Sequence, residues 1–293
     1  MRRENLSFFN LGASLYIPAT HKNLYSTIFE NRFPHLKSII ICLEDSINDD
    51  ELEFAEEKLK DILQKLDRNR DLLIFLRPRS FRHFQKLLSF NHIDKVDGFV
   101  IPKFNLEEFH RWRHYFFEDF YFMPTFENEV VFDEIELRKI RNELLQFKDS
   151  ILTLRIGSED IGKILGIKRG CQKTIYEIPI FTKSVTDLIA IFKPKGFHLS
   201  SPVFSCFKDY ETLQREVLSD LENGLFSKSA IHPKQVEIIQ NIYRVSENEL
   251  QMAEKVVLED RAIFSQNGLM LEKRTHSVWA DNLLRRAKLF GKH

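Results

Sequence analysis

Short apolar runs alternate with longer amphipathic segments along the chain, and this alternation constrains the fold more than any other feature of the sequence. Several runs are almost continuously apolar, which is typical of parallel strands buried on both faces. The expected strands are residues 14–18, 38–45, 72–78, 98–103, 120–126, 151–157, 196–204 and 229–233. Charged, amphipathic helices are expected between them, for example at residues 50–66 and 133–147. The alternation of eight strands with helices predicts an α/β fold of the (β/α)8 TIM-barrel type.

The last part of the chain no longer alternates in this way, which predicts a C-terminal helical extension. Ser246 and Glu249 have the spacing of a capping box, so we expect a long helix to begin there and to continue to about residue 265. We therefore expect a catalytic barrel over residues 1–245 and an extension over residues 246–293 that packs on the barrel or on a neighbouring subunit. An open doubly wound sheet is the alternative fold, but the sequence has no glycine-rich dinucleotide-binding motif to favour it.

Composition limits the classes of function. The 293 residues include 43 basic and 43 acidic side chains, so the chain lacks the positive charge typical of nucleic-acid-binding proteins. No apolar run approaches the roughly 18 residues that a membrane-spanning helix needs. Residues 1–19 place arginines before an apolar stretch, as signal peptides do, but Glu4, Asn5 and Asn10 interrupt that stretch. We expect neither a nucleic-acid partner nor a membrane partner.

The cysteines Cys42, Cys171 and Cys206 have no CxxC or zinc-like spacing. An odd number of scattered thiols is typical of a protein from a reducing compartment. We therefore predict separate thiols and a cytoplasmic location.

Polar and mostly charged residues follow the expected strands, at the ends where the active sites of α/β barrels lie. In chain order they are Glu44 and Asp45, Arg77 and Arg79, Lys103, Glu127 with Glu129 close by, Glu159 and Asp160, Ser200 and Ser201, and His232. Because the charges are of both signs, such a barrel could hold a divalent metal on its carboxylates and an anionic substrate on an arginine.

Two of these carboxylates are the strongest candidates for metal ligands. Glu127 and Asp160 follow different strands and could converge on one Mg²⁺, which takes few protein ligands and keeps water or substrate oxygens in its other positions. Arg77 could hold a substrate carboxylate bidentately beside the metal. Such a site would stabilise an enolate made by breaking or forming a carbon–carbon bond next to a carbonyl.

The chain resembles the citrate lyase beta-subunit-like, HpcH/HpaI aldolase family of C–C bond lyases over nearly its whole length. The segments that carry the resemblance, in the family's order, are SLYIPATHKNL, IICLEDSI, FLRPRS, GFVIPK, MPTFE, RIGSEDIGKILGI and KSAIHPKQVEIIQ. The resemblance implies a (β/α)8 barrel and a Mg²⁺-dependent lyase or aldolase. Its substrate would be a 3-hydroxy acid or acyl thioester, cleaved to or formed from a 2-oxo acid through a metal-stabilised enolate. A coenzyme A thioester is then a candidate substrate, and a homo-oligomer, trimer or hexamer, is expected.

The resemblance also implies roles for individual residues. Glu127 and Asp160 match the family's metal ligands, and Arg77 matches the arginine that contacts the oxo acid. Glu44 and Asp45 match the acidic pair after the second strand, which lies near the metal through waters and orients the base. Asp160 thus binds the metal, whereas its neighbour in the sequence faces away or caps the following helix.

Four departures from the family pattern bear on the substrate. Cys42 stands where an aspartate is usual, Pro78 and Arg79 stand where Val-Asn is usual, and Ser227 replaces a glycine. Thioester-cleaving relatives supply a C-terminal aspartate to a neighbouring subunit, and here the corresponding segment ends in Glu272. The departures weaken the case for a coenzyme A substrate, and Arg79 indicates a more anionic one.

Simpler structural roles stay open for the same residues. Glu129 is the alternative to Glu127 as a ligand, and Asp160 could merely interact with the dipole of the following helix. Lys103 either contacts the substrate or closes the barrel through an ion pair. Arg79 either contacts the substrate or is solvated.

The leading hypothesis is therefore the Mg²⁺-dependent lyase, with Arg77, Arg79 and Lys103 as substrate-binding residues. The alternative is a non-catalytic barrel that serves as a subunit or ligand-binding protein of a biosynthetic complex. A third hypothesis is a barrel enzyme of other chemistry that recognises phosphate through Arg77 and Arg79.

Overall fold

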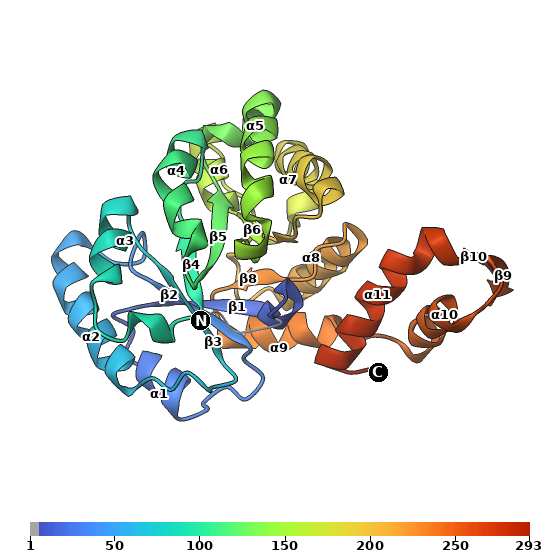
Figure 1. Ribbon diagram of the computed structural model, residues 1–293, viewed down its shortest axis with the longest axis horizontal. Coiled ribbons are helices and arrows are strands. Elements are labelled where there is room, and N and C mark those ends of the chain that lie inside the picture. Colours follow the sequence, from blue (N-terminus) through green and yellow to red (C-terminus); the bar gives the residue numbers. More distant parts are fainter. Residues whose placement is uncertain (1–5) are drawn as a thin grey trace. The chain divides into compact units, whose positions relative to one another are not determined.

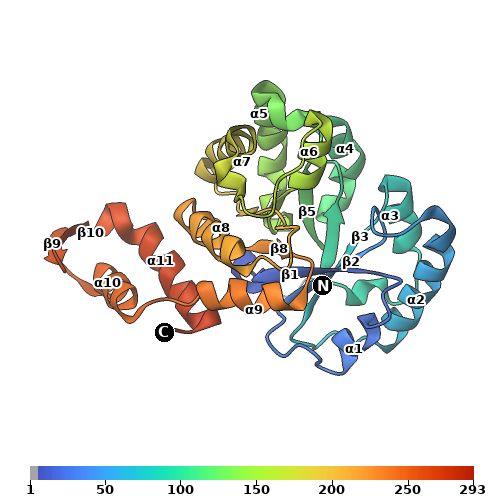
Figure 2. The same ribbon diagram turned by 180° about the vertical axis from the view of Figure 1, so that it is seen from behind.

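The structure is a computed structural model that describes residues 6–293 (Figures 1 and 2), so Glu4 and Asn5 lie outside the described residues. The contacts between residues divide the chain into two compact units, one ending at Glu237 and the other formed by Ile238–His293. The division falls inside α9 (Pro233–Ile242), whereas the boundary after residue 245 lies between α9 and α10 (Glu247–Leu258). That boundary stays a prediction.

Eight parallel strands form one sheet in the first unit. They are β1 (Ala13–Pro18), β2 (Ser38–Cys42), β3 (Leu73–Arg77), β4 (Gly98–Ile101), β5 (Tyr121–Phe126), β6 (Leu154–Ile156), β7 (Leu199–Ser200) and β8 (Lys228–Ala230). Their order is β7-β6-β5-β4-β3-β2-β1-β8, and a parallel bridge between Ser201 and Lys228 joins the two edge strands. Each predicted strand range overlaps one of them, so the predicted TIM barrel is confirmed.

Helices connect successive strands and lie on the periphery of the ring of strands in both ribbon views. They are α1 (Leu24–Phe29), α2 (Leu52–Lys65), α3 (Phe81–Leu88), α4 (Leu106–Trp112), α5 (Glu134–Leu144), α6 (Ser158–Leu165), α7 (Pro179–Phe192) and α8 (Tyr210–Glu222). Short 3₁₀ helices add η1 (Phe8–Leu11), η2 (Asp49–Glu51), η3 (Ile93–Lys95), η4 (Arg113–Phe117), η5 (Glu129–Phe132), η6 (Leu145–Ser150), η7 (Ile175–Glu177) and η8 (Lys193–Lys195). Side-chain caps at Ser80, Asn105 and Asp133 fix where α3, α4 and α5 begin, because each accepts a backbone N–H of the first turn.

An apolar cluster fills the interior of the barrel away from the ends where its strands stop. Its buried members are Leu11, Ile40, Leu73, Phe75, Val100, Met123 and Leu152. Leu73 is the first residue of β3, and Leu11 and Leu152 precede β1 and β6. This packing closes one end of the barrel and leaves polar side chains to line the other end, where barrel active sites lie.

A closed network of buried ions lies between β8 and α8. Lys228 is fully buried, and its Nζ donates to Glu216 Oε1 and Asp220 Oδ2 at 2.9 Å each. Arg169 donates to the other oxygen of Glu216, and the Tyr176 hydroxyl donates to the other oxygen of Asp220 at 2.7 Å. Burial alone would lower the pKa of Lys228, but Asp220 and Glu216 raise it, so the net pKa lies above its ordinary value.

The prediction of separate thiols is wrong for Cys171 and Cys206, which form a disulfide across 35 residues of sequence. Cys171 lies in the loop after α6, and Cys206 lies in the loop after β7. Cys171 thus lies in the connection from β6 to α7, and Cys206 lies in the connection from β7 to α8. Connections from strand to helix meet at the same end of a barrel, and the spacing of two cysteines in the sequence does not reveal this. Cys42 is a free, buried cysteine, and the cytoplasmic location stays a prediction.

The second unit includes α10, a two-stranded hairpin and α11 (Lys273–Phe290). The predicted capping box is present, because Ser246 Oγ accepts from Glu249 N while the Glu249 carboxylate accepts from Ser246 N. The helix ends at Leu258, however, and β9 (Ile263–Gln266) pairs with β10 (Leu269–Glu272) where helix was expected. Asn267 and Gly268 form the turn with positive φ angles of 51° and 77°, as two-residue hairpins require. The C-terminal extension is therefore helical with an inserted hairpin.

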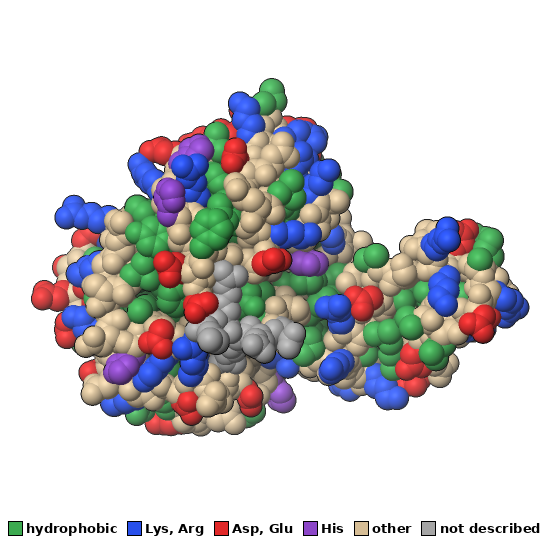
Figure 3. Space-filling model, viewed as in Figure 1, with side chains coloured by type: hydrophobic (Ala, Val, Ile, Leu, Met, Phe, Trp, Pro, Cys, Tyr) green, Lys and Arg blue, Asp and Glu red, His purple; other side chains and the backbone are tan. Residues whose placement is uncertain are grey.

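The visible surface carries charges of both signs. Figure 3 shows Lys and Arg side chains interspersed with Asp and Glu side chains over the face that it displays. Within residues 6–293, no helix combines the length and the hydropathy that crossing a membrane requires.

Candidate active site

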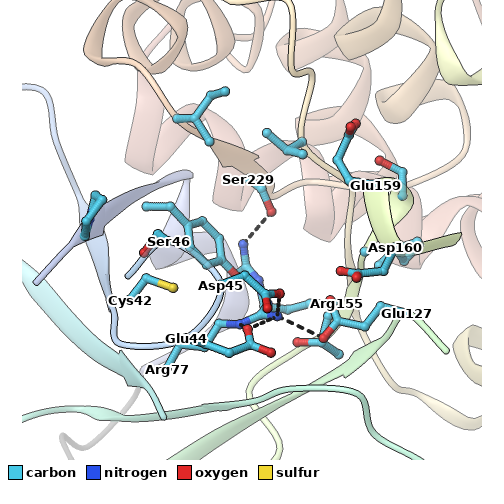
Figure 4. Close-up of a pocket in the computed structure, with 18 residues that line it drawn as sticks. Cys42, Glu44, Asp45, Ser46, Arg77, Glu127, Arg155, Glu159, Asp160 and Ser229 are labelled. Carbon is cyan, nitrogen blue, oxygen red and sulfur yellow. Dashed lines mark hydrogen bonds and ion pairs between the residues drawn. The ribbon is translucent and has the colours of Figure 1, made fainter. Parts of the chain in front are cut away.

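A cavity of about 450 Å³ opens where the barrel strands end (Figure 4). Its lining comes from β1, β2, β3, β5, β6 and β8 and from the loops that follow several strands. The predicted residues Glu44, Asp45, Arg77, Glu127 and Asp160 all line it. The structure thus brings together five residues that are up to 116 positions apart, from Glu44 to Asp160.

A buried arginine holds two carboxylates at the centre of this lining. Arg77 is the last residue of β3, and its guanidinium donates to Glu44 through Nε and to Glu127 Oε1 through Nη2 at 2.9 Å. All three residues are buried, with 3 to 7% of their surface exposed. Burial alone would lower the pKa of Arg77, but Glu127 and Glu44 raise it well above its ordinary value. The guanidinium therefore stays charged.

Lys103 attaches to both of these carboxylates from the loop after β4. Its backbone N–H donates to Glu127 Oε1 at 2.8 Å, and its Nζ donates to Glu44 and, at 3.3 Å, to Asp45 Oδ2. The residue has a positive φ of 48°, which is unusual for a side chain of this size. This strained turn directs the N–H at Glu127 while the ammonium reaches the acidic pair after β2. Of its two predicted roles, the ion pair is present.

Glu127 has an unusual proton affinity. Burial raises its pKa to about 7, Arg77 and the Lys103 N–H oppose the rise, and the neighbouring carboxylates Glu44 and Asp160 add to it. The side chain also packs directly on the backbone of Gly157, where a Cβ would lie 2.4 Å from Glu127 Oε2. Only glycine fits at this position without displacing the carboxylate.

Asp160 and Glu159 both line the cavity, but their carboxylates point in different directions (Figure 4). Asp160 lies in the first turn of α6, is half-buried, and approaches Glu127, whereas Glu159 is exposed and directed away from the Arg77 cluster (Figure 4). Burial and the nearby carboxylates Asp45 and Glu44 raise the pKa of Asp160, although Lys103 and Arg77 oppose this. Glu129, the alternative ligand, is exposed in η5 and does not line the cavity.

The charges of this cluster do not balance. It contains the carboxylates Glu44, Asp45, Glu127 and Asp160 and the cations Arg77 and Lys103. With all four carboxylates ionised, two negative charges are uncompensated. Burial is the main cause of the raised pKa values of Glu127 and Asp160, and the neighbouring carboxylates add to it. A divalent cation on these two carboxylates would neutralise the excess charge, and hard oxygen donors are the ligands that Mg²⁺ prefers.

The number of carboxylates fits a metal that keeps most of its positions open. Within residues 6–293, no three His, Cys, Asp or Glu side chains are arranged to hold a metal ion together. Glu127 and Asp160 are a pair, so water or substrate oxygens would fill the other positions of a bound Mg²⁺. This donor set suits a metal that meets the substrate directly.

Arg79 lies outside the cavity lining. Its Nε donates to Leu43 O at 2.9 Å, and its Nη2 donates to Asn48 O at 3.0 Å and to Ile47 O. It also forms an ion pair with the exposed Asp49. The guanidinium therefore holds the loop that carries the acidic pair, and its contact with substrate stays a prediction.

Lys103, His232 and Glu272 do not line the cavity either. His232 stacks on Phe207, with ring centroids 5.4 Å apart, and its Nδ1 accepts from Lys234 N, which agrees with a structural role. Glu272 belongs to the second unit and accepts from the Thr275 hydroxyl at 2.7 Å. Its approach to a neighbouring subunit stays a prediction.

Arg155 lines the cavity and was missed by the sequence analysis. It is only 1% exposed and lies inside β6, in a run that reads as apolar. The signal that could have revealed it is the alternation of Thr153 and Arg155 with Leu152, Leu154 and Ile156, which places the two polar side chains on one face of the strand.

Comparisons with known proteins agree with the fold and with this resemblance. A structure of CitE from Mycobacterium tuberculosis in complex with magnesium, acetoacetate and coenzyme A has a TM-score of 0.71 at 19% identity, covering 94% of this chain and 98% of that one. RipC from Yersinia pestis has a TM-score of 0.59 at 19% identity, covering 80% and 96%. The citrate lyase beta subunit of M. tuberculosis, complexed with oxaloacetate and magnesium, has a TM-score of 0.62 at 16% identity, covering 80% and 99%. At such identities the likeness shows the fold alone.

The family follows from the sequence itself. None of the curated proteins matches the chain significantly. The family model described as C-C bond lyase of the TIM-Barrel fold matches residues 5–292. Because this match covers almost the whole sequence, the protein belongs to the C–C bond lyases of the TIM-barrel fold, as its resemblance to the citrate lyase beta-like family predicted.

Proposed function

We propose that this chain is a Mg²⁺-dependent lyase or aldolase that cleaves a 3-hydroxy acid or acyl thioester to a 2-oxo acid, or catalyses the reverse reaction. The observation that carries the proposal is the excess of buried carboxylate around Arg77, with Glu127 and Asp160 facing one cavity. The structurally similar citrate lyase beta subunit is complexed with oxaloacetate and magnesium, and CitE with magnesium and acetoacetate, which supports this reaction class for the present chain.

Glu127 and Asp160 would hold the metal. When bound, Mg²⁺ would supply Lewis-acid stabilisation of an oxyanion next to the bond that breaks. Glu127 is fixed for this task on three sides, by Arg77 Nη2, by the Lys103 N–H and by the backbone of Gly157. A carboxylate held this firmly needs little reorganisation when a cation binds.

Arg77 would bind the carboxylate of the 2-oxo acid. A guanidinium has five N–H donors, and the hydrogen bonds of Arg77 to described residues use Nε and Nη2. Nη1 thus remains available for a substrate oxygen at the cavity wall. Because Glu44 and Glu127 fix the plane of the guanidinium, the direction of this remaining donor is fixed as well.

Asp45 is better placed than Glu44 to manage the proton of the substrate hydroxyl. Both oxygens of Glu44 are engaged, one by Arg77 and the other by Lys103. The Asp45 side chain is 63% exposed, with Lys103 Nζ at 3.3 Å from Oδ2. We therefore assign Asp45 to accept the hydroxyl proton, directly or through a water. The C–O bond then becomes a carbonyl, and the electrons of the broken C–C bond pass to the enolate of the other fragment.

The geometry favours this reaction over phosphate recognition by Arg77 and Arg79. Arg79 does not line the cavity, and the loop after β2 engages its guanidinium, so Arg77 and Arg79 do not form a joint site for a phosphate. Whether the substrate carries coenzyme A, and whether the protein is an oligomer, stay predictions.

Calorimetric titration with 2-oxo acids tests the proposal. Pyruvate, glyoxylate and oxaloacetate should bind to the wild-type protein more tightly when Mg²⁺ is present than in EDTA. Glu127→Gln and Asp160→Asn should lose the Mg²⁺-dependent binding, whereas Glu129→Gln, which changes an exposed carboxylate outside the cavity, should retain it. Equal binding with Mg²⁺ and with EDTA, or full metal affinity in Glu127→Gln, would overturn the assignment.

A further inference from the structure

Arg155 is a buried cation without a carboxylate partner. It is 1% exposed, and no carboxylate of a described residue lies within 4.0 Å of its guanidinium nitrogens. The buried cations Arg77, Arg169 and Lys228 each pair with at least one carboxylate. Burying a charge is unfavourable unless it is paired, so the position of Arg155 requires another explanation.

The neutral partners of Arg155 satisfy it only in part. Its Nη2 donates to Ser229 Oγ at 2.8 Å, Nη1 approaches the Met123 sulfur at 3.7 Å, and the guanidinium carbon lies 5.3 Å from the centre of the Tyr16 ring. Nε is buried and has no hydrogen-bond partner. These contacts hold the side chain in place without neutralising its charge.

The unsatisfied polar atoms near Arg155 gather along the cavity. Thr125 is the register partner of Arg155 on β5, so the two side chains point to the same face of the sheet. Thr125 Oγ1 and Ser158 Oγ are also buried without a partner, and both residues line the cavity with Arg155. Buried polar groups are normally satisfied, so three unsatisfied groups on one cavity wall indicate a missing polar ligand.

Arg155 and Arg77 present different electrostatic environments to that ligand. Arg77 is paired with Glu44 and Glu127, whereas the partner of Arg155 in Figure 4 is the neutral hydroxyl of Ser229. Ser229 Oγ accepts from Arg155 and so keeps its own O–H to donate, and it lines the cavity. A donor polarised by a buried guanidinium suits an anionic oxygen.

We propose that Arg155, acting with Ser229, forms an anion subsite that holds a second anionic group of the substrate, a carboxylate or a phosphoryl group. The substrate is then a dianion, with one carboxylate at Arg77 and the metal and the other anionic group at Arg155. The position of the first carboxylate, at Arg77 and the metal, rests on the proposed function. The subsite at Arg155 does not. In this proposal Arg155 recognises the second anionic group, a role that the sequence analysis had assigned to Arg79.

Anion binding to the metal-free protein isolates the subsite. In EDTA, we would titrate succinate and inorganic phosphate into wild type, Arg155→Met, Arg155→Lys and Arg79→Met. The wild type should bind at least one anion, Arg155→Met should bind it at least tenfold more weakly, and Arg155→Lys should recover part of the loss. Arg79→Met removes a nearby guanidinium that does not line the cavity and should bind like wild type. The anion that binds more tightly identifies the group.

Two results would overturn the subsite: no anion binding by the wild type, or equal affinity in Arg155→Met. Circular dichroism and thermal unfolding would establish that Arg155→Met folds, and Ser229→Ala supplies a second variant with the charge retained and an expected loss of affinity. The proposed function is judged separately by Mg²⁺-dependent binding of pyruvate, which has one carboxylate and does not need Arg155. Failure of pyruvate to bind would reject the lyase assignment and leave the anion titrations in EDTA to decide the subsite.

Discussion

Two buried charge clusters in the barrel differ in how completely their members are paired. Behind β8, Lys228 is enclosed by Glu216 and Asp220, and Arg169 and Tyr176 complete the network. At the cavity, Glu44, Asp45, Glu127 and Asp160 surround Arg77 and Lys103. Glu159 adds a fifth carboxylate to the lining, and Arg155 lines the same cavity without a carboxylate of a described residue in ion-pair distance. The members of the first cluster are paired with one another, whereas the second cluster leaves charges unpaired among the described residues.

We expect the fully paired cluster to contribute to stability and the incompletely paired cluster to contribute to ligand binding. A buried ion network with all partners present fixes one arrangement of the chain, and removing one member leaves a charge without compensation. In a buried cluster with surplus charge, a metal or a substrate can supply each missing partner. Binding then compensates a charge whose burial is unfavourable in the free protein. The two clusters should therefore respond in opposite ways to neutral substitutions.

Lys228→Met should give the largest loss of stability. It would leave Glu216 and Asp220 buried, with the ammonium between them gone, and breaking such a network costs about 3–5 kcal/mol of unfolding free energy. Urea unfolding followed by circular dichroism measures the change. Lys60→Met is the matched control, because Lys60 pairs with Glu57 on the surface and its loss should leave stability nearly unchanged. Similar losses in both variants would contradict the comparison.

Glu127→Gln should stabilise the metal-free protein at high pH. The pKa of Glu127 is about 7 in the folded protein against an ordinary value of 4.5, so between these values the folded state retains a proton that the unfolded state has lost. The folded state is therefore favoured at low pH, and the stability contribution of Glu127 falls as the pH rises. Above pH 7 the variant should be more stable by up to about 3 kcal/mol, and the advantage should vanish below about pH 4.5.

Unfolding curves in EDTA from pH 4.5 to pH 8 would measure this difference, with Glu129→Gln as the control for an exposed carboxylate. If the stability advantage of Glu127→Gln grew as the pH fell, its sign would be opposite to the prediction. The claim that burial raises the pKa of Glu127 in the folded protein would then be rejected. Mg²⁺ should reverse the order at pH 8, because it stabilises only the protein that binds it.

The sequence predicted the barrel and most of the charged residues that line its cavity, because both depend on local patterns. Apolar runs mark the strands, and Arg77 and Glu127 follow directly where such runs end. The missed features depend on tertiary structure. Arg155 interrupts an apolar run with one charge, and whether that charge is paired depends on strands and loops far away in the sequence. The hairpin of β9 and β10 did have a local signal, because Asn267-Gly268 lies between two short apolar runs. The expectation of a helical extension did not take this signal into account.

Gly157→Ala should displace the Glu127 carboxylate without changing any charge, and so test whether its position matters for binding Mg²⁺. An alanine Cβ would lie 2.4 Å from Glu127 Oε2 and 2.5 Å from its Cβ, so the carboxylate must shift. We expect a loss of about 1–3 kcal/mol in unfolding free energy, as for other overpacked sites, and a weaker affinity for Mg²⁺ by calorimetry. Gly170→Ala is the control, because its Cβ would meet nothing within 4 Å. Unchanged Mg²⁺ affinity in Gly157→Ala would argue against Glu127 as a ligand.

Arg79→Gln should have the smallest effect on stability, about 1 kcal/mol, because most of its guanidinium contacts are with carbonyls of a surface loop. Its ion pair with Asp49 contributes little, since the Asp49 side chain is 98% exposed. The contacts that matter are those to Leu43 and Asn48, which bracket the acidic pair Glu44 and Asp45 in the sequence. Freeing this loop should weaken Mg²⁺-dependent binding of pyruvate, whereas Asp49→Asn should leave it unchanged. If Arg79→Gln instead lost anion binding in EDTA as severely as Arg155→Met, Arg79 rather than Arg155 would be the residue that recognises the second anionic group.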